Sequence, residues 1–218
     1  MNFVLLFSML PQLWAQTTYN LPNASIHDDS VSFSVGAGIA ALRAGPLPSV
    51  RTSFSYDQGN WGMYLTNTIY QGQKTEGFDV LSLRYLIGNT DRIRIAPTLT
   101  MSDHWGISNM DYRWTTRMGL ALETGQNKWL WDLSINVVGW QYRPLYTNAK
   151  FSKMTGFDTL LTLESGLRYE IKEGHFFRLG LLGPLPAFRY VIPLEKGSLE
   201  ITGATQGTQN VLHVDFRL

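Results

Sequence analysis

The sequence predicts an all-β fold, namely an up-and-down antiparallel transmembrane β-barrel of about twelve strands, with roughly ten as the alternative count. Three observations lead to this prediction. Apolar and polar residues alternate along most segments from Ser30 onward, short and longer connections follow each other along the chain, and charged residues are only 16% of the 218 residues. Ordinary soluble domains contain roughly 25% charged residues. The mean hydropathy of -0.10 excludes a helical membrane protein, so the apolar residues are dispersed.

The N-terminal residues 1–15 are typical of a secretory signal peptide. An apolar run extends from Phe3 to Leu10, Pro11 follows it, and Ala15 supplies a small residue for cleavage. The run is shorter than the ~20 residues of a membrane-spanning helix. We therefore expect a cleaved signal at 1–15, a periplasmic lead at 16–29 and an outer-membrane β-barrel at 30–218. The alternative is a buried apolar N-terminal segment.

The alternation of apolar and polar residues is strongest in KWLWDLSINVV (128–138). Because successive side chains of a strand point to opposite faces, such a segment has one apolar and one polar face. Here the two faces consist of Trp129, Trp131, Leu133, Ile135 and Val137, against Asp132, Ser134 and Asn136. The same pattern recurs in SVSFSVGAGIAAL (30–42), SVRTSFSY (49–56), DRIRIAPTLTM (91–101), YRWTTRMGLALE (112–123) and VLHVDFRL (211–218).

Two kinds of connection separate these segments. Compact turns rich in Gly, Asn and Asp are expected at 57–60, 88–91, 125–128, 172–175 and 195–198. Longer connections are expected at 43–49, 71–77, 102–110, 143–156, 183–187 and 203–207. The GPLP stretches that begin at Gly45 and Gly183 are expected to stop strand pairing at the loop rim. Alternating short and longer connections are typical of an outer-membrane barrel with short periplasmic turns and longer external loops.

Three features favour lipid, rather than water, around the apolar face. All the lysines fall in expected turns and loops, whereas most arginines lie on the polar faces of strands. A barrel of about twelve strands is wider than the ~8-stranded barrel that side chains can fill, so an apolar interior would leave a void. Aromatic residues flank the short turns and are expected to form an interfacial girdle. They are Tyr56, Trp61, Trp129, Trp131, Tyr169 and Phe176.

On these residues the chain resembles the Gram-negative outer-membrane β-barrel proteins, including the porin-like channels, from about Ser30 to Leu218. Its last strand resembles the assembly signal of that class, although the terminal residue is Leu218 and the nearest aromatic residue is Phe216. The resemblance implies an outer-membrane location, contact with membrane lipid and lipopolysaccharide, and recognition by the barrel-assembly machinery through the C-terminal strand. GPLPSVRTSFSYDQGNWGM (45–63) is also faintly similar to the first-hairpin region of the MipA/OmpV family.

The last strand also predicts how the barrel closes. Its apolar residues are expected to face lipid, and His213, Asp215 and Arg217 are expected to face the lumen against the first strand. The apolar residues are Leu212, Val214, Phe216 and Leu218. The polar face of the first strand carries only small residues, which leave space for larger neighbours. They are Ser32, Ser34, Gly36 and Gly38.

The expected lumen face is rich in arginine and contains fewer carboxylates. The arginines are Arg51, Arg84, Arg92, Arg94, Arg113, Arg117, Arg168, Arg178, Arg189 and Arg217, and the acids are Glu123, Asp132, Asp158, Glu164, Glu170, Glu200 and Asp215. One interpretation is a paired ladder that fixes the barrel shape. The other is a narrow pore whose surplus cations favour anionic solutes. The group of Arg92, Arg94, Arg113 and Arg117, with Glu123 as its nearby acid, is the sharpest candidate for an anion or lipid phosphate site.

The functions that remain open are a narrow channel, a structural barrel, a lipid-modifying enzyme of the deacylase or phospholipase type, and a MipA/OmpV-like scaffolding protein. The enzyme alternative depends on His104, Ser108 and Asp111 in an expected external loop. A solvated loop is the simpler interpretation, so a non-enzymatic role is favoured. The formal charge of +1 and the lack of a basic patch give no reason to expect nucleic acid. No cofactor or metal is expected, because the chain has no Cys and its four His show no metal-ligand spacing.

Overall fold

A computed structural model describes residues 30–42, 45–71, 75–90, 93–105, 112–142, 156–182, 185–206 and 209–218. The expected signal peptide at 1–15 and the expected lead at 16–29 therefore lie outside the described residues. Within the described ranges, no helix is long and apolar enough to cross a membrane.

The described residues form antiparallel strands whose lengths range from 8 to 17 residues, together with the two-residue strand β5. In chain order the strands are β1 (Ser30–Leu42), β2 (Gly45–Gln58), β3 (Trp61–Gln71), β4 (Thr75–Tyr85), β5 (Gly88–Asn89), β6 (Ile93–Trp105), β7 (Tyr112–Gln126), β8 (Trp129–Tyr142), β9 (Gly156–Lys172), β10 (His175–Leu182), β11 (Leu185–Pro193), β12 (Ser198–Gln206) and β13 (Gln209–Arg217).

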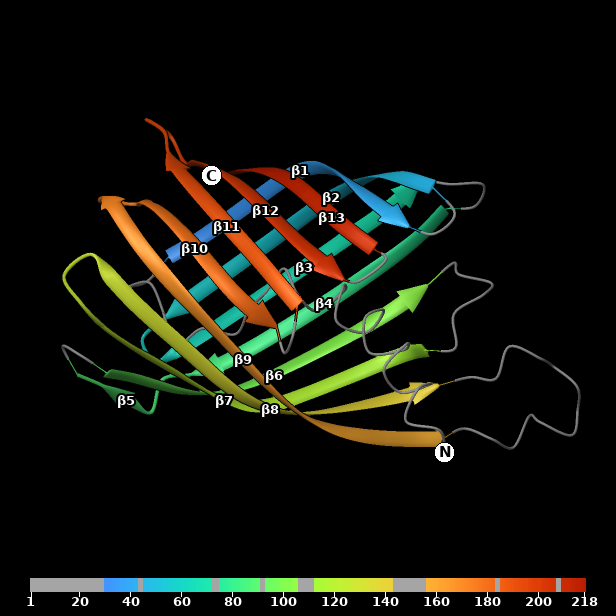
Figure 1. The fold of residues 1–218 in the computed structure, drawn as a ribbon, viewed down its shortest axis with the longest axis horizontal. Coiled ribbons are helices and arrows are strands. Elements are labelled where there is room, and N and C mark those ends of the chain that lie inside the picture. Colours follow the sequence, from blue (N-terminus) through green and yellow to red (C-terminus); the bar gives the residue numbers. More distant parts are fainter. Residues whose placement is uncertain are drawn as a thin grey trace, which may run out of the picture.

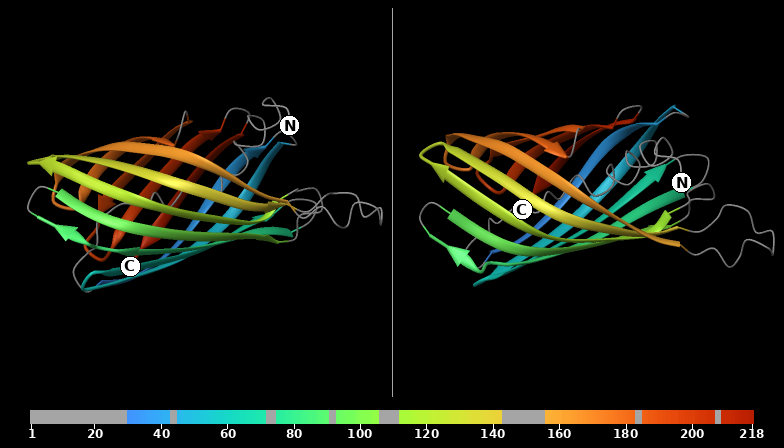
Figure 2. Two further views of the ribbon diagram at one scale, coloured as in Figure 1. Left: turned by 90° about the horizontal axis from the view of Figure 1, so that it is seen from below. Right: turned by 60° about the horizontal axis from the view of Figure 1, so that its bottom comes forward.

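These strands close into a barrel (Figures 1 and 2). Each long strand pairs with its neighbours in sequence, β1 pairs with β13, and β4 pairs with β6. The strand β5 continues beyond β4 along the same edge of β6, after a shift of one residue in register. The closed antiparallel barrel of twelve long strands confirms the fold expected from the sequence.

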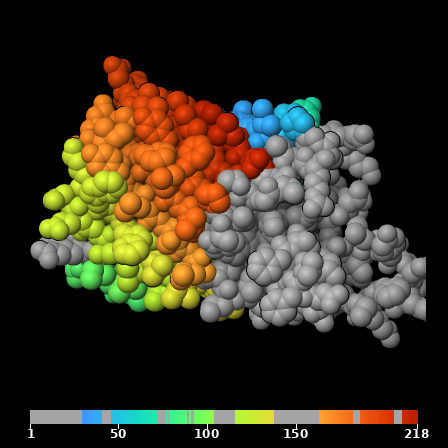
Figure 3. Space-filling view, in the orientation of Figure 1, coloured from blue at the N-terminus to red at the C-terminus, as the bar shows by residue number. Residues whose placement is uncertain are grey.

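The apolar faces of the strands form the outer surface of the barrel. On β8, Trp131 and Ile135 are 58% and 49% exposed, whereas the alternating residues Asp132 and Asn136 are 7% and 0% exposed. In the space-filling view of Figure 3, side chains of β7–β13 cover one outer face continuously. This inside-out distribution is the one expected of a barrel surrounded by lipid.

The last strand closes the barrel as the sequence predicts. Val214 pairs with Ala37 of β1, and Asp215 pairs with Gly36. Val214 is 41% exposed on the outer face, and Asp215 is 2% exposed in the interior. A side-chain carbon added at Gly36 would lie 2.5 Å from the carbonyl oxygen of Val214 and 2.6 Å from Cγ of Asp215. The small residues of β1 are therefore required by the larger residues of β13.

Tight turns join the strands at one end of the barrel, which we call the turn end. Gly59, Asn127, Gly174 and Gly197 all have a positive φ there, between 54° and 90°. Such backbone angles favour glycine and asparagine and match the twist of a two-stranded hairpin. The turn expected at 88–91 differs in detail, because Gly88 and Asn89 are part of β5 and the N–H of Thr90 bonds to the carbonyl of Ile93 at 2.9 Å.

The expectation of longer loops at the other end, which we call the loop end, is wrong for four connections. Strands continue through most of 43–49, 71–77, 183–187 and 203–207, leaving 43–44, 72–74, 183–184 and 207–208 outside the described residues. Residues 102–105 of the expected loop at 102–110 belong to β6, and the rest of that loop, like nearly all of the expected loop at 143–156, lies outside the described residues.

The GPLP stretches do not stop strand pairing, which contradicts the expectation. Pro46 pairs with Ala41 of β1, and Pro186 pairs with Leu181 of β10. The pairing of β2 with β3 begins only at Ser49, so Pro46 lies where β2 has a described neighbour on one side only. Proline is tolerated at such an edge because its missing N–H is not required by a second strand.

Aromatic residues gather on the outer face at the turn end. Trp61 packs against Tyr85 with ring centroids 4.7 Å apart, and Trp129 packs against Tyr169 at 4.6 Å. Phe176, which was expected in the same girdle, instead points inward and lines the interior. Phe176 lies two residues before the inward Arg178, so the alternation along β10 itself directs Phe176 to the inner face.

Candidate functional site in the barrel interior

Ion pairs line the inner wall of the barrel. Among the described residues, arginine and carboxylate partners on different strands lie within 4.0 Å of each other in several contacts. They include Arg51–Asp215, Arg84–Asp57, Arg94–Glu123, Arg117–Glu164, Arg178–Asp132, Arg189–Glu200 and Arg217–Glu200. Most of these side chains are largely shielded from solvent. An arginine fork matches a carboxylate geometrically, so such contacts hold neighbouring strands at fixed distances.

Several of these pairs reach across an intervening strand at a glycine. Arg51 on β2 binds Asp215 on β13, although β1 lies between these two strands. Gly36 of β1 is the register partner of both residues, and the two side chains meet over it. Arg51 also donates from its Nη2 to Oγ1 of Thr202 at 3.1 Å. Because Gly36 has no side chain, the pair can cross β1 without leaving the inner wall.

The same arrangement occurs at two other places. Arg84 on β4 reaches Asp57 on β2 at 2.6 Å across Gly62 of β3. A side-chain carbon at Gly166 of β9 would lie 2.5 Å from Nη2 of Arg178. The inward glycines therefore form part of the ion-pair lattice.

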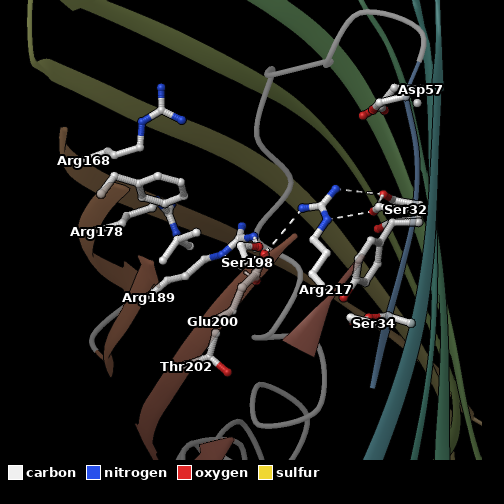
Figure 4. Close-up of a pocket in the computed structure, with 18 of the residues that line it drawn as sticks. Ser32, Ser34, Asp57, Arg168, Arg178, Arg189, Ser198, Glu200, Thr202 and Arg217 are labelled. Atoms are coloured by element: carbon white, nitrogen blue, oxygen red, sulfur yellow. Dashed lines mark hydrogen bonds and ion pairs between the residues drawn. The ribbon is translucent and has the colours of Figure 1, made fainter. Parts of the chain in front are cut away.

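Hydroxyl groups occupy the inner wall formed by β1 and β2. The Oγ atoms of Ser32 and Ser55 are 2.6 Å apart. Arg217 of β13 donates from Nε to Ser32 at 2.7 Å and from Nη2 to Ser55 at 3.0 Å (Figure 4). Arg217 also contacts Glu200 at 3.5 Å, so it links the serines of β1 and β2 to the carboxylate of β12.

His213 is fully buried in the interior. Its Nε2 lies 3.2 Å from Oγ of Ser49, and its ring packs where a side chain at Gly38 would otherwise lie. The structure therefore assigns this histidine to the packing of the closing seam.

A cavity of about 460 Å³ opens inside the barrel toward the turn end, where Gly174 and Gly197 belong to its lining (Figure 4). Six arginines and two carboxylates line it. They are Arg51, Arg84, Arg168, Arg178, Arg189 and Arg217, with Asp57 and Glu200. The hydroxyls of Ser30, Ser32, Ser34, Ser53 and Ser55 form the wall of the cavity on the β1–β2 side. The lining therefore combines apolar side chains with many hydroxyl and charged groups, and among its charged groups arginines outnumber carboxylates.

The structure places most of the expected lumen charges on the inner wall. They are Arg51, Arg84, Arg94, Arg117, Arg168, Arg178, Arg189, Arg217, Glu123, Asp132, Glu164, Glu200 and Asp215. The side chains of Arg92, Arg113 and Asp158 lie outside the described residues, as do the side chain of His104 and the whole of Ser108 and Asp111.

The expectation that Glu123 is the only acid near Arg94 and Arg117 is wrong. Arg94 pairs with Glu123 at 2.8 Å, and Arg117 pairs with Glu164 of β9 at 2.5 Å. Glu164 is distant from Arg117 in sequence, but only β8 separates the two strands that carry them. Ser134 of β8 has a small side chain, and its Oγ donates to Glu164 at 3.3 Å. Both arginines therefore have carboxylate partners, which removes the observation that suggested an anion at this place.

Sequence reasoning missed Asp57, which was assigned to the DQGN turn. The side chain of Asp57 points inward from β2, as do those of Arg51, Ser53 and Ser55, and it is 1% exposed. Because Asp57 follows Ser55 by two residues, the alternation along this strand would have indicated that it faces the interior.

No protein-family model and no curated protein matches this sequence. Solved structures do match the fold. The chain is 12% identical to a KdgM porin in complex with disordered oligogalacturonate, with a TM-score of 0.56 over 85% of this chain and 97% of that chain. It is 11% identical to the COG4313 outer membrane channel from Pseudomonas putida F1, with a TM-score of 0.58 over 88% of this chain and 96% of that chain. This chain has an outer-membrane β-barrel fold. The faint similarity to the MipA/OmpV family gains no support from these comparisons.

Proposed function

We propose that the chain is a narrow channel in the outer membrane of a Gram-negative bacterium, with a lumen that favours anionic solutes. The observation that carries the proposal is the cavity of about 460 Å³ inside the barrel, whose lining includes six arginines but only two carboxylates. Rings of arginine side chains in a narrow pore are typical of selectivity for anions.

The outward apolar surface and the solved neighbours support this location and role. Trp61, Trp129 and Trp131 are 60%, 52% and 58% exposed on the outer face near the turn end, as expected at a membrane interface. Two similar folds are described as a porin and as an outer membrane channel. The porin is also described in complex with oligogalacturonate, and galacturonate carries a carboxylate, so the preference proposed here has a counterpart in the same fold.

Reconstitution into planar lipid bilayers tests the proposal. The refolded barrel is expected to give discrete conductance steps, and a gradient of potassium chloride across the bilayer is expected to give a reversal potential of the sign produced by chloride permeation. A folded barrel that gives no conductance, or a reversal potential set by potassium, would contradict it. Heat-modifiable migration on gels establishes that the sample is folded.

A closed structural barrel is the second candidate, and the ion pairs favour it. Arg51, Arg84, Arg94, Arg117, Arg178, Arg189 and Arg217 each have a carboxylate partner. A lattice of this kind stabilises a fixed shape without requiring a solute. This candidate predicts a folded barrel with no conductance and no binding of small anions.

A further inference from the structure

Three arginines lie directly opposite one another on three consecutive strands. Arg168 of β9 pairs in register with Arg178 of β10, and Arg178 pairs in register with Arg189 of β11. All three line the cavity (Figure 4). Like charges that are directly opposite on neighbouring strands destabilise a sheet unless other groups neutralise them.

Protein carboxylates neutralise two of the three arginines. Arg178 donates from Nε to Asp132 at 2.7 Å. Arg189 donates from Nη2 to both carboxylate oxygens of Glu200, at 2.8 Å and 2.7 Å. Asp132 and Glu200 are thereby engaged, and Arg217 also contacts Glu200.

Arg168 is different from its two neighbours. Among the described residues its guanidinium has no carboxylate partner, and it lies over the ring of Phe176, whose centroid is 5.2 Å from Cζ of Arg168. The same ring lies 5.7 Å from Cζ of Arg189. The ring therefore fixes the position of the Arg168 guanidinium through a cation–π contact without using its N–H donors. In Figure 4 this guanidinium extends away from Arg178 and Arg189.

We propose that Arg168 is the anchor of a binding subsite for a solute that carries a carboxylate or phosphate group and several hydroxyls. The planar guanidinium has five N–H donors whose geometry matches the oxygens of both anionic groups. The serine hydroxyls of β1 and β2 line the same cavity and provide donors and acceptors for the hydroxyls of the solute. This inference specifies the solute class of the channel proposed above and rests on that proposal for its role in transport.

Calorimetric titration of the refolded barrel in detergent tests the subsite directly. The probes are gluconate, glucose 6-phosphate, acetate and glucose. Gluconate carries a carboxylate and glucose 6-phosphate carries a phosphate, and both have several hydroxyls. Both are therefore expected to bind. Acetate lacks the hydroxyls and is expected to bind more weakly, and glucose lacks the charge and is expected to give no binding.

The substitution Arg168→Gln is expected to weaken gluconate binding roughly 10- to 100-fold, since hydrogen bonds to a charged group are lost. Lys172→Gln is the matched control, because Lys172 is an exposed residue at the end of the same strand and loses the same charge. It is expected to leave binding unchanged. Phe176→Leu removes the ring that positions Arg168 and is expected to weaken binding less than Arg168→Gln. It provides a second test if Arg168→Gln fails to fold.

Two results would overturn the subsite. One is equal gluconate affinity in the native barrel and a folded Arg168→Gln variant, and the other is equal loss of affinity in Arg168→Gln and Lys172→Gln, which would indicate a general charge effect. Acetate that binds as tightly as gluconate would overturn the role of the serines. Binding that depends on Arg168 in a barrel without conductance would refute the channel and keep the subsite. Conductance with an anion preference that is independent of Arg168 would refute the subsite and keep the channel.

Discussion

The substitution Gly36→Ala adds one methyl group to the inner face of β1, at the seam where the barrel closes. The new carbon would overlap the carboxylate of Asp215 and lie 2.5 Å from the backbone oxygen of Val214. The backbone of β13 cannot move without disturbing its pairing with β1 and β12. The Asp215 side chain must therefore turn away from Arg51.

The cost follows from the burial of the ion pair. The side chains of Arg51 and Asp215 are only 4% and 2% exposed. Separating such a pair leaves buried charges without compensation, which destabilises proteins by about 3–5 kcal/mol. We expect Gly36→Ala to lower the free energy of unfolding by an amount in this range. A change of one methyl group on an open surface costs about 0.5 kcal/mol or less.

Urea unfolding of the barrel refolded into lipid vesicles, followed by tryptophan fluorescence, measures the change. Ala37→Val is the matched control, because Ala37 is the next residue on β1 and is exposed on the outer face. A loss of stability for Gly36→Ala no larger than that for Ala37→Val would refute the reasoning. The double variant with Asp215→Ala supplies a second check: Gly36→Ala is expected to cost less there, since the overlapping carboxylate is absent.

Three further outcomes follow from the two faces of the barrel. Arg178→Ala is expected to lower the free energy of unfolding by about 3–5 kcal/mol because it removes the arginine from a buried ion pair with Asp132. Lys172→Ala, at an exposed position on the preceding strand, is expected to cost about 0.5 kcal/mol or less, and comparable losses in urea unfolding would contradict this difference. Val214→Arg is expected to cost roughly 2–4 kcal/mol if the residue lies near mid-membrane, and an unchanged unfolding midpoint in vesicles would argue against lipid at this face. Cysteines placed singly at Arg217 and Phe216 are expected to react with a water-soluble and a lipid-phase thiol reagent, respectively, and the reverse labelling would exclude a membrane barrel.

The alternation of apolar and polar residues was sufficient to predict the fold class, the strand positions and the inward or outward direction of most side chains. On β13, for example, His213 and Val214 lie on the expected faces. The signal extends over each strand because successive side chains point to opposite sides, so every strand repeats the information several times. Phe176 was expected in the outer girdle because it lies beside a turn, whereas its spacing of two residues from the inward Arg178 indicates the inner face.

The ends of the strands were less predictable. Proline and glycine in the GPLP stretches indicate loops, yet Pro46 and Pro186 belong to paired strands. Inside a sheet, proline is unfavourable because it lacks the N–H that would bond to a neighbouring strand. At an edge position no such bond is needed, so proline can belong to a paired strand there. Whether a neighbouring strand is present on both sides is a tertiary property.

By itself the sequence predicted a closed sheet with an apolar outer face and a polar inner face. Only the tertiary structure decided which charges meet, because the register between strands sets the partners. Arg117 meets Glu164 two strands away, and Arg51 meets Asp215 at the opposite end of the chain. The same register leaves Arg168 without a carboxylate among the described residues, although composition alone does not distinguish it from Arg178. An alternating pattern specifies the direction of a side chain, whereas an ion pair depends on position along two or three strands at once.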